Sequence, residues 1–251
     1  MTSRTTLIGV KVLAANNGGS LGAILAGVVY AADQDAHVAN MSLGGVLPRV
    51  GNGALVSLIQ RTMNYAKQKG MLVVVSAGNL ALDQDHDGAL FQNFCNASHV
   101  VCVSAVGPST PTASPDEPSL YTNFGRSTIS VAAPGGNFVA GFPVAAWPWG
   151  NGTASIIWSL CSKTRLALSP TGGVLGLAGC QAGNRLLQQV GTSQAAPHVS
   201  GLAALLMAEH GTGNAQQIKH MIERSAVDLG QTGTDPYYGR GRIDVARALG
   251  L

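Results

Sequence analysis

A serine that could act as a nucleophile stands at the start of an apolar helical pattern. Residues 191–201 read GTSQAAPHVSG, and from Ser193 onward small and apolar residues recur at steps of three and four, which predicts one buried helical face. Pro197 falls in the first turn, where a missing N–H costs little. A hydroxyl at this position lies at the positive end of the helix dipole, which suits attack that creates an oxyanion, although a serine there could also serve only as an N-cap.

The segments that must position this serine alternate between two periodicities. Apolar, β-branched runs predict strands at residues 7–13, 38–42, 71–76, 100–106 and 129–132. Helical spacing predicts helices from Ser20, over 52–69, from Ser193, over 214–224 and over 244–249. Strand and helix in turn imply right-handed crossovers, so the sequence predicts an α/β fold in three layers, with a mostly parallel sheet and helices on both faces.

Ligands bind parallel sheets at the carboxyl ends of their strands, so the loops after the predicted strands matter most. Three of them, residues 16–20, 43–45 and 77–79, are rich in glycine and allow another backbone to approach closely. The first could suggest a dinucleotide site, but GGSLG at 18–22 does not fit the spacing Gly-x-Gly-x-x-Gly. A nucleotide site is therefore not favoured.

Composition limits the function classes further. The 251 residues are 46% hydrophobic and only 11% charged, which indicates one large, well-buried domain. The formal charge of +3 is not gathered into any Lys/Arg cluster, so nucleic acid is not an expected partner. Residues 127–162 carry no charge, but prolines and glycines break that stretch repeatedly, so no membrane span is expected.

The motif around Ser193 resembles the active-site serine motif of the subtilisin-like serine proteases, the subtilases. Further stretches are similar to that family in the same order; they are VKVL at 10–13, GGS at 18–20, NMSLGG at 40–45, VVSAGN at 74–79, AAPG at 132–135 and YYGRG at 237–241. The resemblance implies a subtilisin-like domain over residues 1–251 that lacks its N-terminal part. It also implies an enlarged segment at about 136–189.

What the resemblance implies about the site follows residue by residue. Ser193 would be the nucleophile of a serine endopeptidase that forms an acyl-serine, and Asn79 would donate a hydrogen bond to the oxyanion. The substrate, a protein or peptide, would lie as an added strand between two edges and reach a specificity pocket. The edges would be Gly18, Gly19 and Ser20 on one side and Ser42, Leu43 and Gly44 on the other, with Ala77 and Gly78 lining the pocket.

The sequence departs from the family pattern at the general base. Subtilases need an Asp-[Ser/Thr]-Gly motif and a His-Gly-Thr-His motif, and neither occurs in residues 1–251. His198 lies on the same predicted helix as Ser193, so we interpret it as structural. We expect this chain by itself to be inactive or nearly so, with a missing N-terminal segment of the same protein as a possible partner. The alternative is a peptide-binding pseudoprotease that keeps the cleft without the base.

The four cysteines lack zinc-site spacing and could pair by proximity, Cys95 with Cys102 and Cys161 with Cys180, although Cys102 could equally be a small buried residue. Pairing would suit an oxidising compartment. Residues 1–6 show no apolar core of a signal peptide, so for the parent protein we expect an extracellular or periplasmic location with its signal left off.

An acidic loop could hold a metal. Asp83, Asp85 and Asp87 alternate before Gly88, as in the first half of a calcium loop, but position twelve would be Phe94 where a glutamate is needed. The chemistry itself requires no cofactor. A structural calcium ion remains possible here, and a solvated acidic turn is the favoured interpretation.

Overall fold

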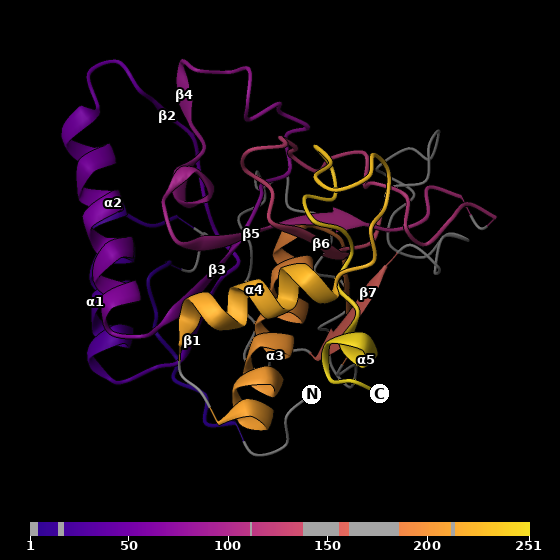
Figure 1. Ribbon diagram of the computed structural model, residues 1–251. Helices are drawn as coiled ribbons and strands as arrows, with labels where there is room; N and C mark the ends of the chain where they lie inside the picture. Colours follow the sequence, from indigo (N-terminus) through magenta and orange to yellow (C-terminus); the bar gives the residue numbers. More distant parts are fainter. Residues whose placement is uncertain (1–4, 15–17, 111, 138–155, 161–185, 212–213) are drawn as a thin grey trace.

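The computed structural model describes residues 5–14, 18–110, 112–137, 156–160, 186–211 and 214–251 (Figure 1). Its centre is a parallel sheet of four strands in the order β1-β3-β5-β6. These strands are β1 (Val38–Met41), β3 (Leu72–Ser76), β5 (Val100–Val106) and β6 (Val131–Pro134). Val74 in β3 pairs with Asn40 on one side and with Val101 on the other. Both central strands are buried along their whole length, as parallel strands between two helical layers require.

Helices cover both faces of the sheet (Figure 1). On one face lie α1 (Leu21–Asp33) and α2 (Gly53–Gln68), and on the other α3 (Thr192–His210) and α4 (Ala215–Ser225), with the short α5 (Val245–Ala248) beside α4. Alternate residues of β3 serve the two layers, because successive side chains of a strand point to opposite faces. Leu72 and Val74 pack in the core beneath α3, whereas Val73 and Val75 pack in the core beneath α1 and α2. The predicted three-layer α/β fold is confirmed.

Local capping explains where the helices begin and end. The Ser20 hydroxyl accepts a hydrogen bond from the backbone N–H of Ala23, and Asn214 caps α4 in the same way. Beyond the end of α2, Gly70 takes a φ of +83°, a left-handed conformation that glycine adopts without strain. Side-chain caps therefore set the starts of α1 and α4, and a glycine in the left-handed region follows the end of α2.

Smaller elements lie around the central sheet. A short antiparallel pair joins β2 (Leu47–Pro48) to β4 (Leu90–Phe91), and a 3₁₀ turn, η1 (Asn93–Asn96), follows. A second antiparallel pair joins β7 (Ile157–Leu160) to β8 (Leu186–Gln189). Apart from these two strands and residues 136, 137 and 156, the expected enlarged segment at 136–189 lies outside the described residues.

The strand predicted at residues 7–13 is not formed. These residues contain no strand, and Leu7 is 89% exposed. A strand exists only with a hydrogen-bonded neighbour, and no described strand pairs with this segment, so its apolar, β-branched pattern alone cannot make one. The segment still packs on α1, because a Cβ on Gly27 would lie 2.5 Å from a methyl carbon of Val12.

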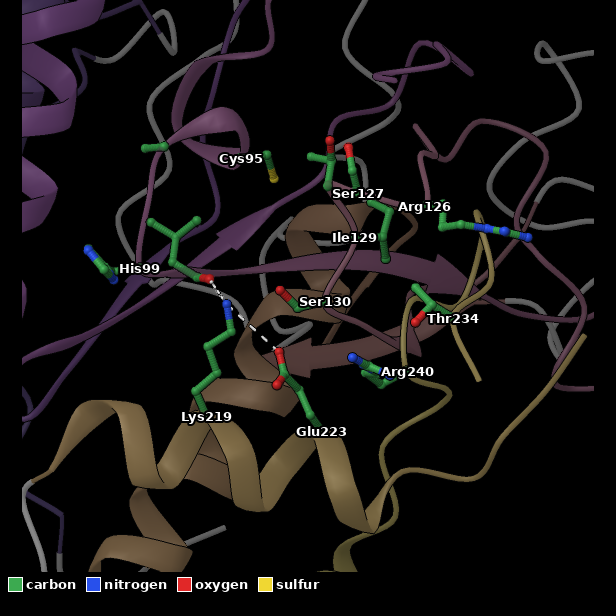
Figure 2. A pocket seen from close by; sticks show the side chains of 13 residues that line it. Cys95, His99, Arg126, Ser127, Ile129, Ser130, Lys219, Glu223, Thr234 and Arg240 are labelled. Carbon is green, nitrogen blue, oxygen red and sulfur yellow. Dashed lines mark hydrogen bonds and ion pairs between the residues drawn. The ribbon is translucent and has the colours of Figure 1, made fainter. Parts of the chain in front are cut away.

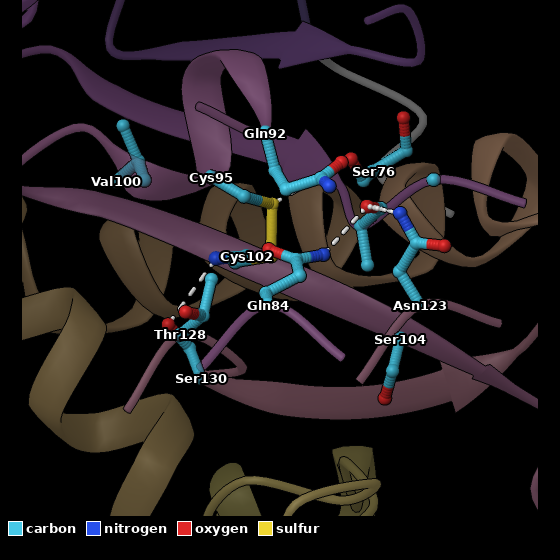
Figure 3. The surroundings of a disulfide bond; sticks show 12 residues. Ser76, Gln84, Gln92, Cys95, Val100, Cys102, Ser104, Asn123, Thr128 and Ser130 are labelled. Atoms are coloured by element: carbon cyan, nitrogen blue, oxygen red, sulfur yellow. Dashed lines mark hydrogen bonds between the residues drawn. A yellow bond between two sulfur atoms is a disulfide. The ribbon is translucent and has the colours of Figure 1, made fainter. Parts of the chain in front are cut away.

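A disulfide bond joins Cys95 in η1 to Cys102 in β5 (Figure 3). Both cysteines are buried, and the Cys95 sulfur lies 3.6 Å from the backbone oxygen of Ser76 at the end of β3. This pair is one of the two that the sequence suggested. Cys161 and Cys180 lie outside the described residues. None of the helices in the described part of the chain combines the length and the apolar character needed to cross a bilayer.

Candidate active site

Ser193 lies where the carboxyl end of β1 meets the start of α3. It is the second residue of that helix and is half-buried. The Ser193 hydroxyl donates a hydrogen bond to the backbone oxygen of Ser42 over 3.2 Å, and the Ser42 hydroxyl donates to the backbone oxygen of Ser193 over 2.7 Å. This reciprocal pair fixes the loop after β1 against the helix that carries the serine.

Asn79, which follows β3, is held against the same helix end. Its side-chain oxygen accepts hydrogen bonds from the Thr192 backbone N–H over 2.9 Å and from the Thr192 hydroxyl over 2.7 Å. The Thr192 hydroxyl oxygen in turn accepts from the Gly78 backbone N–H over 3.1 Å. Because the Asn79 oxygen is engaged in this way, its amide nitrogen is the end that remains for a ligand, and no described residue accepts a hydrogen bond from it.

Two hydrogen-bond donors face one space beside the serine. A Cβ built on Gly191 would lie 3.5 Å from the Asn79 Nδ2 atom and 3.6 Å from the Ser193 backbone nitrogen. No described residue accepts a hydrogen bond from that backbone N–H either. Gly191 has a φ of +151° and no side chain, so this space is bounded by the two nitrogen atoms and by the Gln194 side-chain oxygen, which would lie 2.7 Å from the same Cβ. A negatively charged oxygen placed there would meet an amide donor, a backbone donor and the positive end of the α3 dipole.

The start of α3 is tied to the sheet on a second side. The Gly191 backbone N–H donates to the backbone oxygen of Gly135, directly after β6, over 2.9 Å. Farther along, the Ser200 hydroxyl donates to the Asn40 side chain in β1. The helix itself is buried through residues such as Val199 and Leu202, so its first turn has little freedom to move.

Comparison with known proteins decides which family this arrangement belongs to. The model of the subtilase family, Peptidase S8, matches residues 2–241. The chain belongs to the subtilase family. Its expected resemblance is thereby confirmed, and so is the subtilisin-like form of its α/β fold.

Individual subtilases align over nearly all of the chain. Thermitase from Thermoactinomyces vulgaris is 29% identical over 98% of this chain and 66% of its own length. A thermophilic serine proteinase from Bacillus sp. (strain AK1) is 30% identical over 99% of this chain and 46% of its own length. The crystal structure of a lanthipeptide protease superposes with a TM-score of 0.74 at 28% identity, covering 96% of this chain and 68% of that one. The chain thus spans about half to two thirds of the length of these curated relatives.

The residues expected to bind substrate fall into two groups. Ser42 contacts Ser193 directly, Leu43 packs on the core beneath α1 and α2, and Gly44 is exposed. Ala77 is buried, and its backbone oxygen accepts from two side-chain amides.

The other expected edge, residues 18–20, lies at the start of α1. There Ser20 caps the helix, and a Cβ on Gly19 would meet the backbone oxygen of Val12 at 2.7 Å. No hydrogen bond joins Gly18, Gly19 or Ser20 to the Ser193 loop within the described residues. The role of both edges in this subtilase stays a prediction.

None of the six histidines, all of which are described, forms a hydrogen bond with Ser193. The His198 ring bonds through Nδ1 to the backbone oxygen of Gln194 on its own helix. His86 pairs with Asp83, and His220 pairs with Glu223. The Ser193 hydroxyl proton therefore points to a backbone carbonyl and not to a base.

The acidic loop uses its carboxylates internally. The Asp83 carboxylate accepts from the backbone N–H groups of Asp85 and His86 and pairs with the His86 ring at 2.7 Å. The Asp85 carboxylate accepts from the backbone and hydroxyl of Ser127. Within the described part of the chain, no group of three or more His, Cys, Asp or Glu side chains could hold a metal. As placed here, Asp83, Asp85 and Asp87 do not converge to fit calcium, and the calcium site stays a prediction.

A cavity of about 250 Å³ lies at the opposite end of the sheet from Ser193 (Figure 2). The cavity lies at the start of β5 and next to the residues that precede β6, beside α4. The Lys219 ammonium donates to the backbone oxygen of Val100 over 2.7 Å and lies 3.8 Å from Glu223. Because parallel strands all present their carboxyl ends at the other edge, this cavity is separate from the candidate subtilase site.

Sequence reasoning missed the part played by Thr192. This side chain is fully buried and contacts both Asn79 and Gly78, although more than a hundred positions separate them in the chain. A signal was present, since a buried hydroxyl needs a hydrogen-bond partner and Thr192 directly precedes Ser193, the expected nucleophile. The sequence could not show which group that partner would be.

Proposed function

We propose that this chain is the part of a serine endopeptidase that carries the nucleophile and the oxyanion donors. Ser193 Oγ would attack the carbonyl carbon of a peptide bond, and the Asn79 amide and the Ser193 backbone N–H would hold the oxyanion that forms. The proton from Oγ passes through a general base to the departing amine, and water then hydrolyses the acyl-serine. The observation that carries the proposal is that these two donors face one space beside the Ser193 hydroxyl.

The general base is the part of the proposal that lies outside residues 1–251. Neither family motif for the aspartate and the histidine occurs in this sequence. A serine without a base is a poor nucleophile at neutral pH, so residues 1–251 alone should hydrolyse peptides slowly or not at all. We propose that another segment of the same protein supplies both groups, and that together they act on a protein or peptide substrate.

The proposal is tested with an internally quenched peptide and a fluorophosphonate probe. Residues 1–251 are compared with the same chain extended by whatever coding sequence precedes it at its genomic locus. The extended form should hydrolyse the peptide and label on Ser193, and Ser193→Ala should abolish both. Asn79→Ala should lower kcat by about 10²- to 10³-fold, which is the loss known for removal of one such donor from a subtilisin, a protein of the same family.

Other outcomes of this experiment separate the alternatives. Rapid labelling of Ser193 in residues 1–251 would show that a base lies within them. Saturable binding of the peptide by the extended form, with no hydrolysis and no labelling, would instead support a peptide-binding pseudoprotease. The proposed endopeptidase would then be wrong.

We further propose an extracellular or periplasmic location for the parent protein. The buried Cys95–Cys102 disulfide supports it, because such bonds persist in oxidising compartments. Cell fractionation of the native host, followed with an antibody to this chain, should find the protein outside the cytoplasm. Recovery in the cytoplasm with both cysteines reduced would contradict this.

A further inference from the structure

One buried amide controls the loop that carries Asn79. Asn123 lies between β5 and β6 and is only 2% exposed. Its side-chain oxygen accepts from the backbone N–H of Leu80 over 2.9 Å and of Leu82 over 3.1 Å, and its Nδ2 atom donates to the backbone oxygen of Ala77 over 3.0 Å. Figure 3 shows the Asn123 and Gln84 amides converging on one backbone oxygen. Asn79 is thus enclosed between backbone groups that Asn123 holds.

The turn that Asn123 holds is a strained one. Ala81 has a φ of +51°, in the left-handed region that residues with a Cβ rarely adopt. The two N–H groups on either side of Ala81 both reach the same Asn123 oxygen. Such a conformation costs of order 1 kcal/mol or more and persists only where surrounding contacts impose it. Backbone hydrogen bonds from Ala81 to Tyr121 and from Phe124 to Leu82 also hold this turn. We expect that without the Asn123 amide they would not keep the Asn79 backbone in its present position.

Asn123 also contacts Gly78, the residue that precedes Asn79. A Cβ on Gly78 would lie 2.4 Å from the Asn123 Nδ2 atom, so the amide fills the space where a side chain would be. The Asn123 backbone N–H also donates to the Gly78 backbone oxygen over 2.9 Å. Asn123 therefore contacts the backbone on both sides of Asn79, whereas Thr192 holds the Asn79 side chain and the Gly78 backbone N–H on one side only.

We propose that Asn123 is a positioning residue for the oxyanion donor: its side chain sets the backbone from which Asn79 directs its amide toward the developing charge. This inference rests on the proposed function, because it assigns Asn123 to the same reaction. A donor stabilises the transition state only when it already points at the charge, so a shift of the loop should lower kcat and leave substrate binding largely intact.

The test is a double-mutant cycle on the form of the protein that hydrolyses the quenched peptide. Asn123→Ala should lower kcat by about 10- to 100-fold with KM changed by less than about threefold. In an Asn79→Ala background the same change should lower kcat by less than about threefold, since the donor it positions is already gone. Equal losses in both backgrounds, or a rise in KM alone, would overturn the proposal.

A matched control separates positioning from general stability. Asn137 is equally buried, and its side-chain amide also bonds to backbone groups: its oxygen accepts from the N–H of Leu120, and its nitrogen donates to the oxygens of Gly107 and Pro118. No hydrogen bond joins its side chain to residues 77–82 in the described structure. Asn137→Ala should lower the unfolding temperature much as Asn123→Ala does, yet it should leave kcat within about threefold. A matching fall in kcat would show that Asn123 acts only through stability.

Two further measurements test the same point. The first needs no catalytic activity, and the second uses a variant that keeps the volume of the Asn123 side chain. Amide hydrogen exchange at Leu80 and Leu82 should speed up at least about tenfold in Asn123→Ala and not in Asn137→Ala. Unchanged exchange would overturn the inference about Asn123, and this result does not require an active protein. A lack of hydrolysis in every form of the protein would refute the proposed function instead. Ala81→Gly removes the left-handed strain and should restore part of the kcat lost in Asn123→Asp, which keeps the side-chain volume. No recovery would count against the inference.

Discussion

The Asn79 side-chain oxygen accepts two hydrogen bonds from Thr192, one from the Thr192 backbone N–H over 2.9 Å and one from the Thr192 hydroxyl over 2.7 Å. The amide of an asparagine has two ends, and only the nitrogen end can donate to an oxyanion. By occupying the oxygen end, Thr192 leaves the nitrogen end available to donate into the space beside Gly191. Thr192, the residue before the proposed nucleophile, therefore orients the proposed oxyanion donor.

Thr192→Val should weaken this orientation. The variant keeps the backbone hydrogen bond to Asn79 but loses the hydroxyl bond, and it also leaves the Gly78 N–H without its acceptor. We expect kcat to fall by about 3- to 30-fold and stability to fall by about 1 to 3 kcal/mol. Steady-state kinetics and urea unfolding measure the two effects. Thr192→Ser, which retains the hydroxyl, is the control and should recover most of kcat.

Gly191→Ala should block the site physically. The added methyl group would stand in the space proposed for the oxyanion, 3.5 Å from the Asn79 amide nitrogen and 3.6 Å from the Ser193 backbone nitrogen, and the Gln194 side-chain oxygen at 2.7 Å would have to move aside. We expect hydrolysis and fluorophosphonate labelling to fall at least about a hundredfold, as when an oxyanion donor is lost. The φ of +151° adds a backbone cost of about 1 to 3 kcal/mol. Normal labelling in a folded Gly191→Ala protein would place the oxyanion elsewhere.

Removing the disulfide should lower stability and leave the donors in place. Cys95 and Cys102 are seven residues apart, so the bond closes a short loop worth about 2 to 3 kcal/mol in the unfolded chain. The Cys95→Ala/Cys102→Ala double variant should melt about 4 to 12 °C lower, as scanning calorimetry would show. Both sulfurs are buried, so a mild reductant should leave the native protein unchanged. Rapid reduction without unfolding would contradict that burial.

The Asp83–His86 ion pair predicts a window of pH-dependent stability. The hydrogen bond to His86 lowers the pKa of Asp83, and the same bond, with smaller contributions from the charges of Asp83 and Asp85, raises the pKa of His86. The Asp83 contribution is present above its ordinary value of 3.8 and is lost as pH falls through the lowered pKa. The His86 contribution is full below 6.5 and is lost as pH rises through the raised pKa.

The pair should therefore stabilise the fold most between about pH 4 and 6. Because both groups are exposed, the effect should be small and weakened by salt. Unfolding temperatures of the wild type and His86→Gln, measured from pH 3 to pH 9, should differ most inside this window. A difference that does not vary with pH would show that the pair contributes no electrostatic stability.

Much of the fold could be predicted from local sequence pattern, and the segment at 7–13 is the exception. The predicted strand at 100–106 is formed with those bounds, because an uninterrupted apolar, β-branched run can be buried only between two layers. The last sheet strand begins two residues later than predicted, at Val131, where its ladder with β5 starts. The segment at 7–13 has an equally good pattern and is not a strand, because a strand depends on a partner and its own residues do not encode one.

The candidate site divides in the same way. Contiguous motifs predict Ser193 and Asn79, since the glycines and small residues around them are required locally. Thr192 and Asn123 act on the Asn79 loop from 113 and about 43 positions away along the chain. Thr192 stands in the serine motif, but neither its neighbours nor those of Asn123 show which distant loop the side chain contacts.

The parallel sheet gives the site one more property, which concerns synthesis. Ser42, Asn79 and Ser193 lie on segments that come together only when the strands between them have paired and α3 has closed over the sheet. A nascent chain can present Ser42 and Asn79 early, but it lacks Ser193 until nearly four fifths of the 251 residues have been made. The proposed catalytic centre therefore cannot form until translation has passed Ser193, so the proposed activity would not reach the host cell from an incomplete polypeptide.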